Sequence, residues 1–405
     1  MHEKTGPVAN KEVVFILNTH MPYVLTDGPI FQEKENWLFE AITETYIPLF
    51  KALEQWDPAT QPGKRIIFSM TPCLFNQLVE GKERYLAYLD VMEKIGEYEL
   101  ERTSNIEEYN RFLNHKVELG WSELSNAHAT ALAYLNRVRE SREFWANLDV
   151  AVYLNQLFDS KKQGVEAWTS SPFHNFLPFF EGNTVDYFVK RGKEEFEKVF
   201  DRSPDGFWMP ECAFMPGTEK YFKKHGIGAT ALTVPGIGAY TGTDRSGVYQ
   251  HDGLKIYSHD YRLAMYLWKA PDTTFPSDPA YREFYRDIGL DVSNDYFDHI
   301  GVTVHRGKSG LAWTGYKYFA ITGPEVDLGE KRIYAPGQVQ ERLSLQVKEF
   351  DKILERNRAL SNDERTFIFA FDTELFGHWW HEGVDWLSHM LQYEFIDEPV
   401  LSETL

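Results

Sequence analysis

Cysteine is almost missing from this chain of 405 residues, which contains only Cys73 and Cys212. Two cysteines cannot build the disulfide framework of a small secreted domain, so a reducing compartment is expected. No apolar run reaches the roughly 20 residues that a membrane-spanning helix needs. The polar first segment, residues 1–11, lacks the charged-then-apolar pattern of a signal peptide. The composition therefore predicts a cytoplasmic protein with no membrane contact.

The chain also has fewer basic than acidic residues. The chain has 42 Lys and Arg residues against 61 Asp and Glu residues, which gives a formal net charge of −19 at pH 7. It lacks the Lys- or Arg-rich stripe that follows a phosphate backbone, so nucleic acid is not an expected partner. The acidic surplus indicates a well-solvated surface and says nothing about the substrate.

Seven short apolar runs, bounded by turn residues and followed by helix-like stretches, predict buried strands. Runs that are apolar on both faces and separated by helices indicate a parallel sheet. The length fits one elaborated α/β barrel as well as two or three average domains. The predicted strands cover residues 13–18, 65–70, 165–169, 207–210, 229–234, 316–322 and 366–371.

Two segments differ from this alternation of strands and helices. Residues 81–162 are rich in charge and free of proline, which predicts a helical insertion domain. The barrel would then consist of residues 1–80 and 163–395, followed by a C-terminal tail, residues 396–405. Residues 236–253 contain glycines at close intervals and show no helical period, so a mobile surface loop is predicted there.

Two acidic residues, Glu211 and Asp372, each close an apolar strand-like run and are followed by aromatic residues. Parallel α/β barrels carry their chemistry at the carboxyl ends of the strands, and aromatic rings suit the apolar face of a sugar. Glycoside cleavage needs two carboxyl groups, one to attack the anomeric carbon or activate water and one to protonate the leaving oxygen. We therefore predict that Glu211 and Asp372 are a catalytic pair; structural pairing of both with buried arginines is the less favoured alternative.

Further segments extend this pattern along nearly the whole chain, in a fixed order. They are Asn18-Thr-His20-Met-Pro22, residues 37–49, Gly164-Val-Glu166 with His174, Trp208-Met-Pro-Glu211-Cys-Ala213, residues 278–289, residues 314–323 and Asp372-Thr-Glu-Leu-Phe-Gly-His378-Trp-Trp380. Together they resemble glycoside hydrolase family 57, and within it the 1,4-α-glucan branching type. A match over several ordered segments is far more specific than a lone motif.

The resemblance implies a fold, a substrate and a reaction. The fold would be α/β, a distorted (β/α)7 barrel with a helical insertion domain. The substrate would be an α-1,4-glucan such as glycogen, starch or a maltooligosaccharide, with no cofactor and no metal. Glu211 would be the nucleophile and Asp372 the general acid/base of a retaining reaction that forms α-1,6 branches in glycogen biosynthesis. An α-amylase, a 4-α-glucanotransferase and a catalytically impaired glucan-binding protein stay open as alternatives.

Sugar contacts are expected from histidine and aromatic side chains around the pair. A core position is the alternative for each histidine and tryptophan among them. The resemblance also implies a loop tyrosine that excludes water, for which Tyr249 is the candidate and Tyr240 the alternative. A metal site built from histidines and Asp372, as in a deacetylase or mannosidase, is the rival hypothesis among enzymes. The candidate sugar-binding residues are His20, His174, Trp208, His378, Trp379, Trp380 and Tyr249.

The chain departs from the family pattern in two places. Asn18 stands where the opening motif has a histidine, so one sugar contact is expected to differ. The sequence also ends about thirty residues after Asp372, whereas branching-type relatives continue into a C-terminal helical domain. We expect that domain to be missing or to be supplied by a separate subunit.

Overall fold

The computed structural model describes residues 12–30, 33–159, 164–241, 245–268, 277–304, 312–361 and 366–395. At its centre lies one sheet of eight strands in the order β6-β7-β5-β4-β3-β2-β1-β8. All neighbouring strands run parallel except β6 and β7. The strands are β1 (Val13–Thr19), β2 (Lys64–Met70), β3 (Val165–Ser170), β4 (Gly206–Trp208), β5 (Ala229–Thr233), β6 (Gly247–His251), β7 (Leu254–His259) and β8 (Phe367–Asp372).

The sheet curls until β8 meets the β6–β7 end. The backbone N–H of Asp260, which follows β7, donates to the carbonyl of Ile368 on β8 at 3.0 Å. The N–H of Ile368 in turn donates to the hydroxyl of Ser246 at 3.1 Å. Seven parallel strands thus form a nearly closed barrel, and the predicted distorted (β/α)7 fold is confirmed. Six of the seven predicted strands lie within two residues of their expected bounds.

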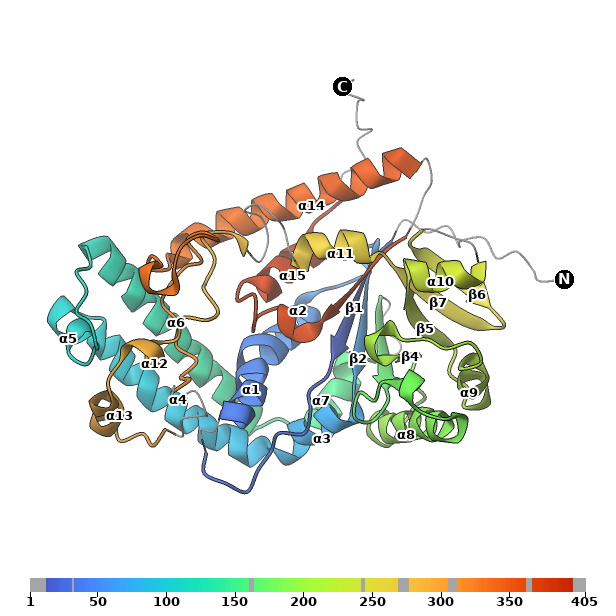
Figure 1. Ribbon diagram of the computed structural model, residues 1–405, viewed down its shortest axis with the longest axis horizontal. Helices are drawn as coiled ribbons and strands as arrows, with labels where there is room; N and C mark the ends of the chain where they lie inside the picture. The colour runs from blue at the N-terminus through green and yellow to red at the C-terminus, as the bar shows by residue number, and fades with distance from the viewer. Residues whose placement is uncertain are drawn as a thin grey trace.

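Helices pack around the barrel and extend well beyond it on one side (Figure 1). Residues 82–157 are mainly helical, and α13 from a distant part of the chain packs against α4; the division into an insertion domain stays a prediction. Within the described ranges, none of the helices has the length and apolar character to cross a membrane. The helices are α1 (Glu33–Ala41), α2 (Ile47–Gln55), α3 (Pro72–Glu80), α4 (Lys82–Arg102), α5 (Ile106–Asn110), α6 (Trp121–Ala146), α7 (Val150–Leu157), α8 (Gly182–Phe200), α9 (Glu219–Lys224), α10 (Val234–Thr241), α11 (Tyr261–Trp268), α12 (Ile288–Asp291), α13 (Asn294–Ile300), α14 (Val339–Ser361) and α15 (Gly383–Gln392).

The prediction of a mobile loop over residues 236–253 is wrong for the part that the structure describes. Helix α10 begins directly after Thr233, whose hydroxyl accepts the N–H of Gly236 at 3.1 Å, and Pro235 lies in its first turn. Both are ordinary signals of a helix start. Farther on, Asp252 and Gly253 have φ values of 50° and 80° and join β6 to β7 as a tight hairpin. The Asp-Gly pair favours such a turn because both positions need positive φ.

The predicted strand at residues 316–322 is also wrong. The segment is largely buried, but it forms no continuous strand: Phe319 bridges to Ile333 and Ala320 to Arg282 as isolated β-bridges. Just before it, the carboxylate of Asp287 accepts the backbone N–H groups of Thr314 and the following glycine. Short sets of backbone hydrogen bonds to residues 279–288 on one side and 332–334 on the other thus take the place of a continuous ladder.

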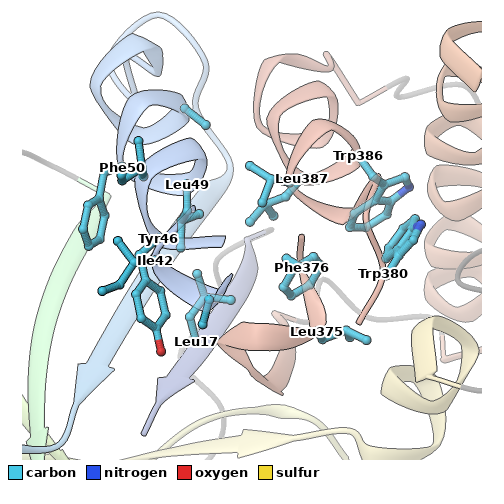
Figure 2. Close-up of a cluster of buried hydrophobic side chains, with 14 of the residues drawn as sticks. Leu17, Ile42, Tyr46, Leu49, Phe50, Leu375, Phe376, Trp380, Trp386 and Leu387 are labelled. Atoms are coloured by element: carbon cyan, nitrogen blue, oxygen red, sulfur yellow. The ribbon is translucent and has the colours of Figure 1, made fainter. Parts of the chain in front are cut away.

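The main core lies between the sheet and the helices that follow β1 and β8. Figure 2 shows one part of it, where Phe376 and Leu387 from the C-terminal part of the chain face Leu49 and Tyr46 from its N-terminal part. Helices α2 and α15, separated by more than 300 residues of sequence, lie side by side there. This packing fixes the segment between β8 and α15, which carries part of the candidate site.

Helix α8 approaches β3 at Gly192 too closely for any side chain. A Cβ atom at this position would lie 2.1 Å from the carbonyl oxygen of Ser170 and 3.1 Å from the ring of Phe207. We therefore expect Gly192→Ala to lower the stability by about 1 to 3 kcal/mol through overpacking, although alanine favours a helix by about 1 kcal/mol. Thermal unfolding measures the change. Gly329→Ala is the matched control because a Cβ at that position meets no atom within 4 Å, and equal midpoints for both variants would contradict the close approach.

Candidate active site

Polar side chains from four strands meet at one rim of the barrel. Asn18 is the penultimate residue of β1 and Asp372 the last residue of β8, while His174 and Glu211 follow β3 and β4. Parallel strands present their carboxyl ends at the same edge, which is where barrel enzymes place reacting groups. The sheet thus gathers residues that are up to 354 positions apart in sequence.

A stacked pair of histidines lies between the two predicted catalytic carboxylates. The rings of His20 and His174 are 3.8 Å apart between centroids and 15° from parallel. His174 Nε2 lies 3.3 Å from Glu211 Oε1, and His20 Nδ1 lies 3.8 Å from Asp372 Oδ1. Each carboxylate therefore has its own histidine, and ring stacking connects the two halves of the site.

Asn18 organises the Asp372 half of the site. Its side-chain amide donates to Asp372 Oδ1 at 3.0 Å and lies 3.1 Å from His20 Nδ1. An amide that donates to Nδ1 leaves Nε2 as the nitrogen that carries hydrogen in the neutral ring. The residue that replaces the motif histidine is thus buried, and it positions the predicted acid/base and its neighbouring ring.

His174 acts on Glu211 as a neutral donor. Burial, with the adjacent His20 ring, lowers the pKa of His174 to about 3. The ring is therefore uncharged at neutral pH, and its Nε2–H can donate to Glu211 without neutralising the carboxylate. Glu211 itself is 69% exposed and Asp372 36% exposed, so a ligand can reach both groups from the rim.

A hollow lined by aromatic rings opens next to the segment that follows Asp372. Its volume is about 390 Å³, within the range of roughly 300 to 1,000 Å³ that is typical of small-ligand sites. Stacked indole rings and a few polar groups are the combination that recognises sugar rings. The residues that line the hollow are Lys34, Asn36, Trp37, Glu40, Phe284, Trp313, Lys317, His378 and Trp379.

Buried charges lie behind His378, one of the residues that line this hollow. Glu44 accepts Arg282 Nη1 at 2.9 Å and lies 3.2 Å from His378 Nδ1. Burial works against its ionisation, but Arg282, His378 and Lys317 hold the pKa of Glu44 well below its usual value. Burial raises the pKa of Glu40 to about 7, with Lys317 opposing and Glu44 adding to the rise.

Within the described ranges, Glu40, Glu44 and His378 offer ligand atoms within 4.8 Å of one another, close enough for a metal ion. Two cations, Arg282 and Lys317, already balance much of the negative charge at this point. A further cation would have to compete with them, so the donor set suits hydrogen bonding to an uncharged ligand better than metal binding. The rival set around Asp372 is divided, because His378 contacts Glu44 while His20 and His174 form the stacked pair.

The structure separates the predicted aromatic contacts into two groups. Trp379 is 36% exposed and lines the hollow. Trp208 and Trp380 are buried in the core, so their rings offer no face to a sugar in this conformation.

The assignment of Tyr249 is corrected: it lies on β6, is 3% exposed and donates its hydroxyl to the carbonyl of Arg245. It is packed in the core because β6 is a regular strand rather than a lid. Tyr240 belongs to α10, and its side chain lies outside the described part of the chain.

Several site residues escaped the sequence reasoning. Glu40 and Glu44 are four residues apart, and Trp37 precedes Glu40 by three, so all three share one helical face. That spacing was a usable signal. Gly377 packs against the backbone of Glu44, where a Cβ would lie 2.0 Å from the carbonyl oxygen and φ is +103°. The partnership of Glu44 with Arg282, which is 238 residues away, had no local signal.

The chain is similar to known proteins along most of its length. The model of the family Glycosyl hydrolase family 57 matches residues 14–303. A 1,4-alpha-glucan branching enzyme of Thermococcus kodakarensis is 28% identical over 97% of this chain. The alignment covers 57% of that relative, so the chain spans little more than half of its length.

Two solved structures share the fold over 94% of the chain. The alpha-amylase AmyC of Thermotoga maritima is 27% identical, with a TM-score of 0.79 and 71% of its own chain covered. A branching enzyme of Pyrococcus horikoshii is 28% identical, with a TM-score of 0.73 and 67% of its chain covered. Both similarities extend across the barrel and the helices beside it.

A second carboxyl group, Glu374, is buried two residues after Asp372 and accepts a hydrogen bond from the hydroxyl of Tyr46. Burial raises the pKa of Glu374 from 4.5 to about 8; the Tyr46 hydrogen bond opposes this rise, and the charge of Asp372 adds to it. The folded protein therefore binds this proton more tightly than the unfolded chain does. The stability that depends on it is complete below pH 4.5 and is lost as the pH rises through about 8.

We expect Glu374→Gln to become more stable relative to the parent protein as the pH increases from 5 to about 9. The neutral amide avoids the cost of a buried carboxylate at high pH. Thermal unfolding at several pH values measures the difference, and Glu101→Gln, at an exposed position of α4, should show no such trend. A difference between Glu374→Gln and the parent that stays constant with pH would mean that Glu374 is already ionised in the folded state.

Proposed function

Because the chain belongs to glycosyl hydrolase family 57, we propose that it is an α-glucan-active retaining enzyme that most resembles a 1,4-α-glucan branching enzyme. Glu211 is the proposed nucleophile and Asp372 the proposed general acid/base. The observation that supports this most directly is the pair of exposed carboxylates bridged by stacked His20 and His174 at the carboxyl end of the barrel.

The first chemical step breaks an α-1,4 bond. Glu211 Oε attacks the anomeric carbon while Asp372, in its protonated form, gives its proton to the departing 4-oxygen. The products are a glycosyl ester on Glu211, a shortened glucan with a new 4-hydroxyl and an ionised Asp372. The neutral His174 would orient Glu211 for attack and leave its negative charge available.

The second step returns the proton to Asp372. In branching, Asp372 removes the proton of a 6-hydroxyl on another glucan, whose oxygen attacks the anomeric carbon and releases Glu211. The aromatic hollow with Trp37, Trp313 and Trp379 would hold part of one glucan during this exchange. If water takes the place of the 6-hydroxyl, the same two carboxyl groups carry out hydrolysis.

Hydrolysis is the second candidate function. It is supported by the similarity to the alpha-amylase of Thermotoga maritima, which extends over nearly the whole chain. The α-1,4-glucan substrate, a role in glycogen biosynthesis and a cytoplasmic location are part of the proposal for either activity.

Incubation with amylose tests the function. Branching shifts the iodine absorbance without new reducing ends, hydrolysis releases reducing ends, and disproportionation redistributes chain lengths. We expect Glu211→Gln to abolish every one of these changes, because an amide cannot form the glycosyl ester. Asp372→Asn should lower kcat by about 10² to 10⁴, the usual contribution of a general acid/base.

Folding must be shown to survive these substitutions. Both are nearly isosteric, so thermal midpoints close to that of the parent are expected. Glu181→Gln, which replaces an exposed carboxylate near the start of α8, should retain full activity. Retention on amylose with no chemical change in the parent protein would leave only a glucan-binding role, and normal turnover by Glu211→Gln would reject the proposed nucleophile.

An exposed tyrosine at the carboxyl end of β7 replaces Tyr249 in the proposed control of transfer. Tyr261 is 57% exposed and begins α11, which Asp260 caps by accepting the N–H groups of Arg262 and Leu263. A side chain at this rim can cover the glycosyl ester and lower the access of water, whose concentration would otherwise favour hydrolysis. We expect Tyr261→Ala to decrease the ratio of branches formed to reducing ends released, with bond cleavage less affected.

The matched control is Tyr187→Ala, because Tyr187 is similarly exposed at 55% but lies on the outer helix α8. Tyr261→Phe should keep most of the effect if the ring itself excludes water. A product ratio that is the same for the parent, Tyr261→Ala and Tyr187→Ala would remove Tyr261 from the proposal.

A further inference from the structure

The turn that presents Glu211 has an unusual backbone. Glu211 and Cys212 have φ values of 58° and 50°, so two successive residues with side chains adopt the left-handed conformation. Among residues other than glycine, this region is sparsely populated and costs conformational energy at each position. Surrounding contacts must therefore hold the pair in place.

The local hydrogen bonds account for only part of this restraint. The N–H of Cys212 donates to the carbonyl of Met209 at 2.9 Å, which closes a turn with Pro210 at its second position and Glu211 at its third. A positive φ at the third position is the mark of a type II turn, where glycine is the usual residue. A catalytic carboxylate cannot be replaced by glycine, so this turn carries strain that glycine would relieve.

The side chain of Cys212 supplies an anchor on a different strand. Its Sγ lies 3.3 Å from Nε2 of His259, the last residue of β7. His259 is 6% exposed, and Cys212 packs against the cluster inside the barrel that contains Trp208 and Tyr257. This contact joins a half-buried thiol to a buried imidazole and restrains the turn from a second strand.

The protonation states fit a hydrogen bond from the thiol to the ring. Burial lowers the pKa of His259 to about 4, with the charge of Asp260 opposing the shift, so the ring is neutral at neutral pH. Burial, with the charges of Glu211 and Asp372, raises the pKa of the Cys212 thiol well above its usual value. Cys212 thus keeps its proton, and the S–H can donate to the lone pair of Nε2.

His259 on β7 is also adjacent to the contact between β7 and β8, the strand that ends at Asp372. The residue after His259, Asp260, donates its backbone N–H to Ile368 on β8, four residues before Asp372. The contact from Cys212 to His259 therefore ties the turn of Glu211 to the closure of the barrel. Both carboxylates are held through the same short stretch of β7 and β8.

We propose that Cys212 and His259 are a positioning pair that holds the strained turn of Glu211 in the geometry needed for attack. This inference rests on the proposed role of Glu211 as nucleophile. The pair acts through the backbone of Glu211 and does not touch the substrate. It gives the cysteine that follows Glu211 a physical role.

The experiment compares Cys212→Ala, Cys212→Ser, His259→Phe and the double variant Cys212→Ala/His259→Phe with the parent. We expect Cys212→Ala to lower kcat on amylose by about 10- to 100-fold, the effect of a misplacement of about 1 Å, while KM changes less than about twofold because substrate contacts stay in place. Cys212→Ser keeps a donor and should recover most of kcat. Cys73→Ala, at the other cysteine, should leave kcat unchanged.

The double variant distinguishes a functional pair from two separate packing defects. If the two residues act as a unit, the double variant should lose no more kcat than the more impaired single variant. Multiplied losses would overturn the proposal. His259→Phe keeps the ring volume, so it provides the test even if Cys212→Ala folds poorly.

Crystal structures of the same variants decide the inference without an activity assay. We expect the 3.3 Å contact between His174 Nε2 and Glu211 Oε1 to persist in Cys212→Ser and to be lost in Cys212→Ala. An unchanged turn in Cys212→Ala, or a changed turn with normal kcat, would overturn the proposal. If the parent protein does not act on amylose, the proposed function fails on that result, and the structures alone decide whether the pair holds the turn.

Discussion

The site depends on the closure of a sheet that would otherwise keep its two carboxylates apart. In strand order, β3, β2 and β1 lie between β4, which leads to Glu211, and β8, which ends at Asp372. A flat sheet would place these strands well over 15 Å apart, since neighbouring strands are spaced about 4.8 Å. Curling brings β8 to the β6–β7 end, where the backbone N–H of Asp260 donates to the carbonyl of Ile368. The stacked histidines can then contact both acids at once.

Much of the fold was accessible from the sequence because buried parallel strands are short, apolar and separated by helices. Six strands and the helical character of residues 82–157 follow from such local patterns. The errors have local causes as well. The close glycines at 236–253 predict a loop, although Pro235 and the Asp252-Gly253 pair are signals of a helix start and a hairpin. The apolar run at 316–322 resembled a strand because burial alone does not reveal whether a ladder partner exists.

The site was predictable to the extent that its residues stand beside strand ends. Glu211 and Asp372 could be singled out because each follows an apolar run, and the structure brings their histidines together. Contacts between distant segments have no comparable signal in the local sequence. The partnership of Glu44 with Arg282 depends on packing across 238 residues, and Tyr249 was misplaced because its exposure depends on the pairing of β6 with β7. Local sequence reports which groups are present at an edge, whereas tertiary packing decides which of them face the ligand.

The charges around the catalytic pair and those around the aromatic hollow suit different tasks. In the proposed reaction the sugar passes through an oxocarbenium-like transition state, which is positively charged. A cation paired with Glu211 would oppose that charge and weaken the nucleophile, whereas the neutral His174 orients the carboxylate by a single hydrogen bond. Beside the hollow, by contrast, Arg282 and Lys317 lie close to buried acids, and their charges are balanced within the protein. The arrangement keeps negative charge exposed where bonds would break and presents a nearly neutral, aromatic surface where an uncharged sugar would rest.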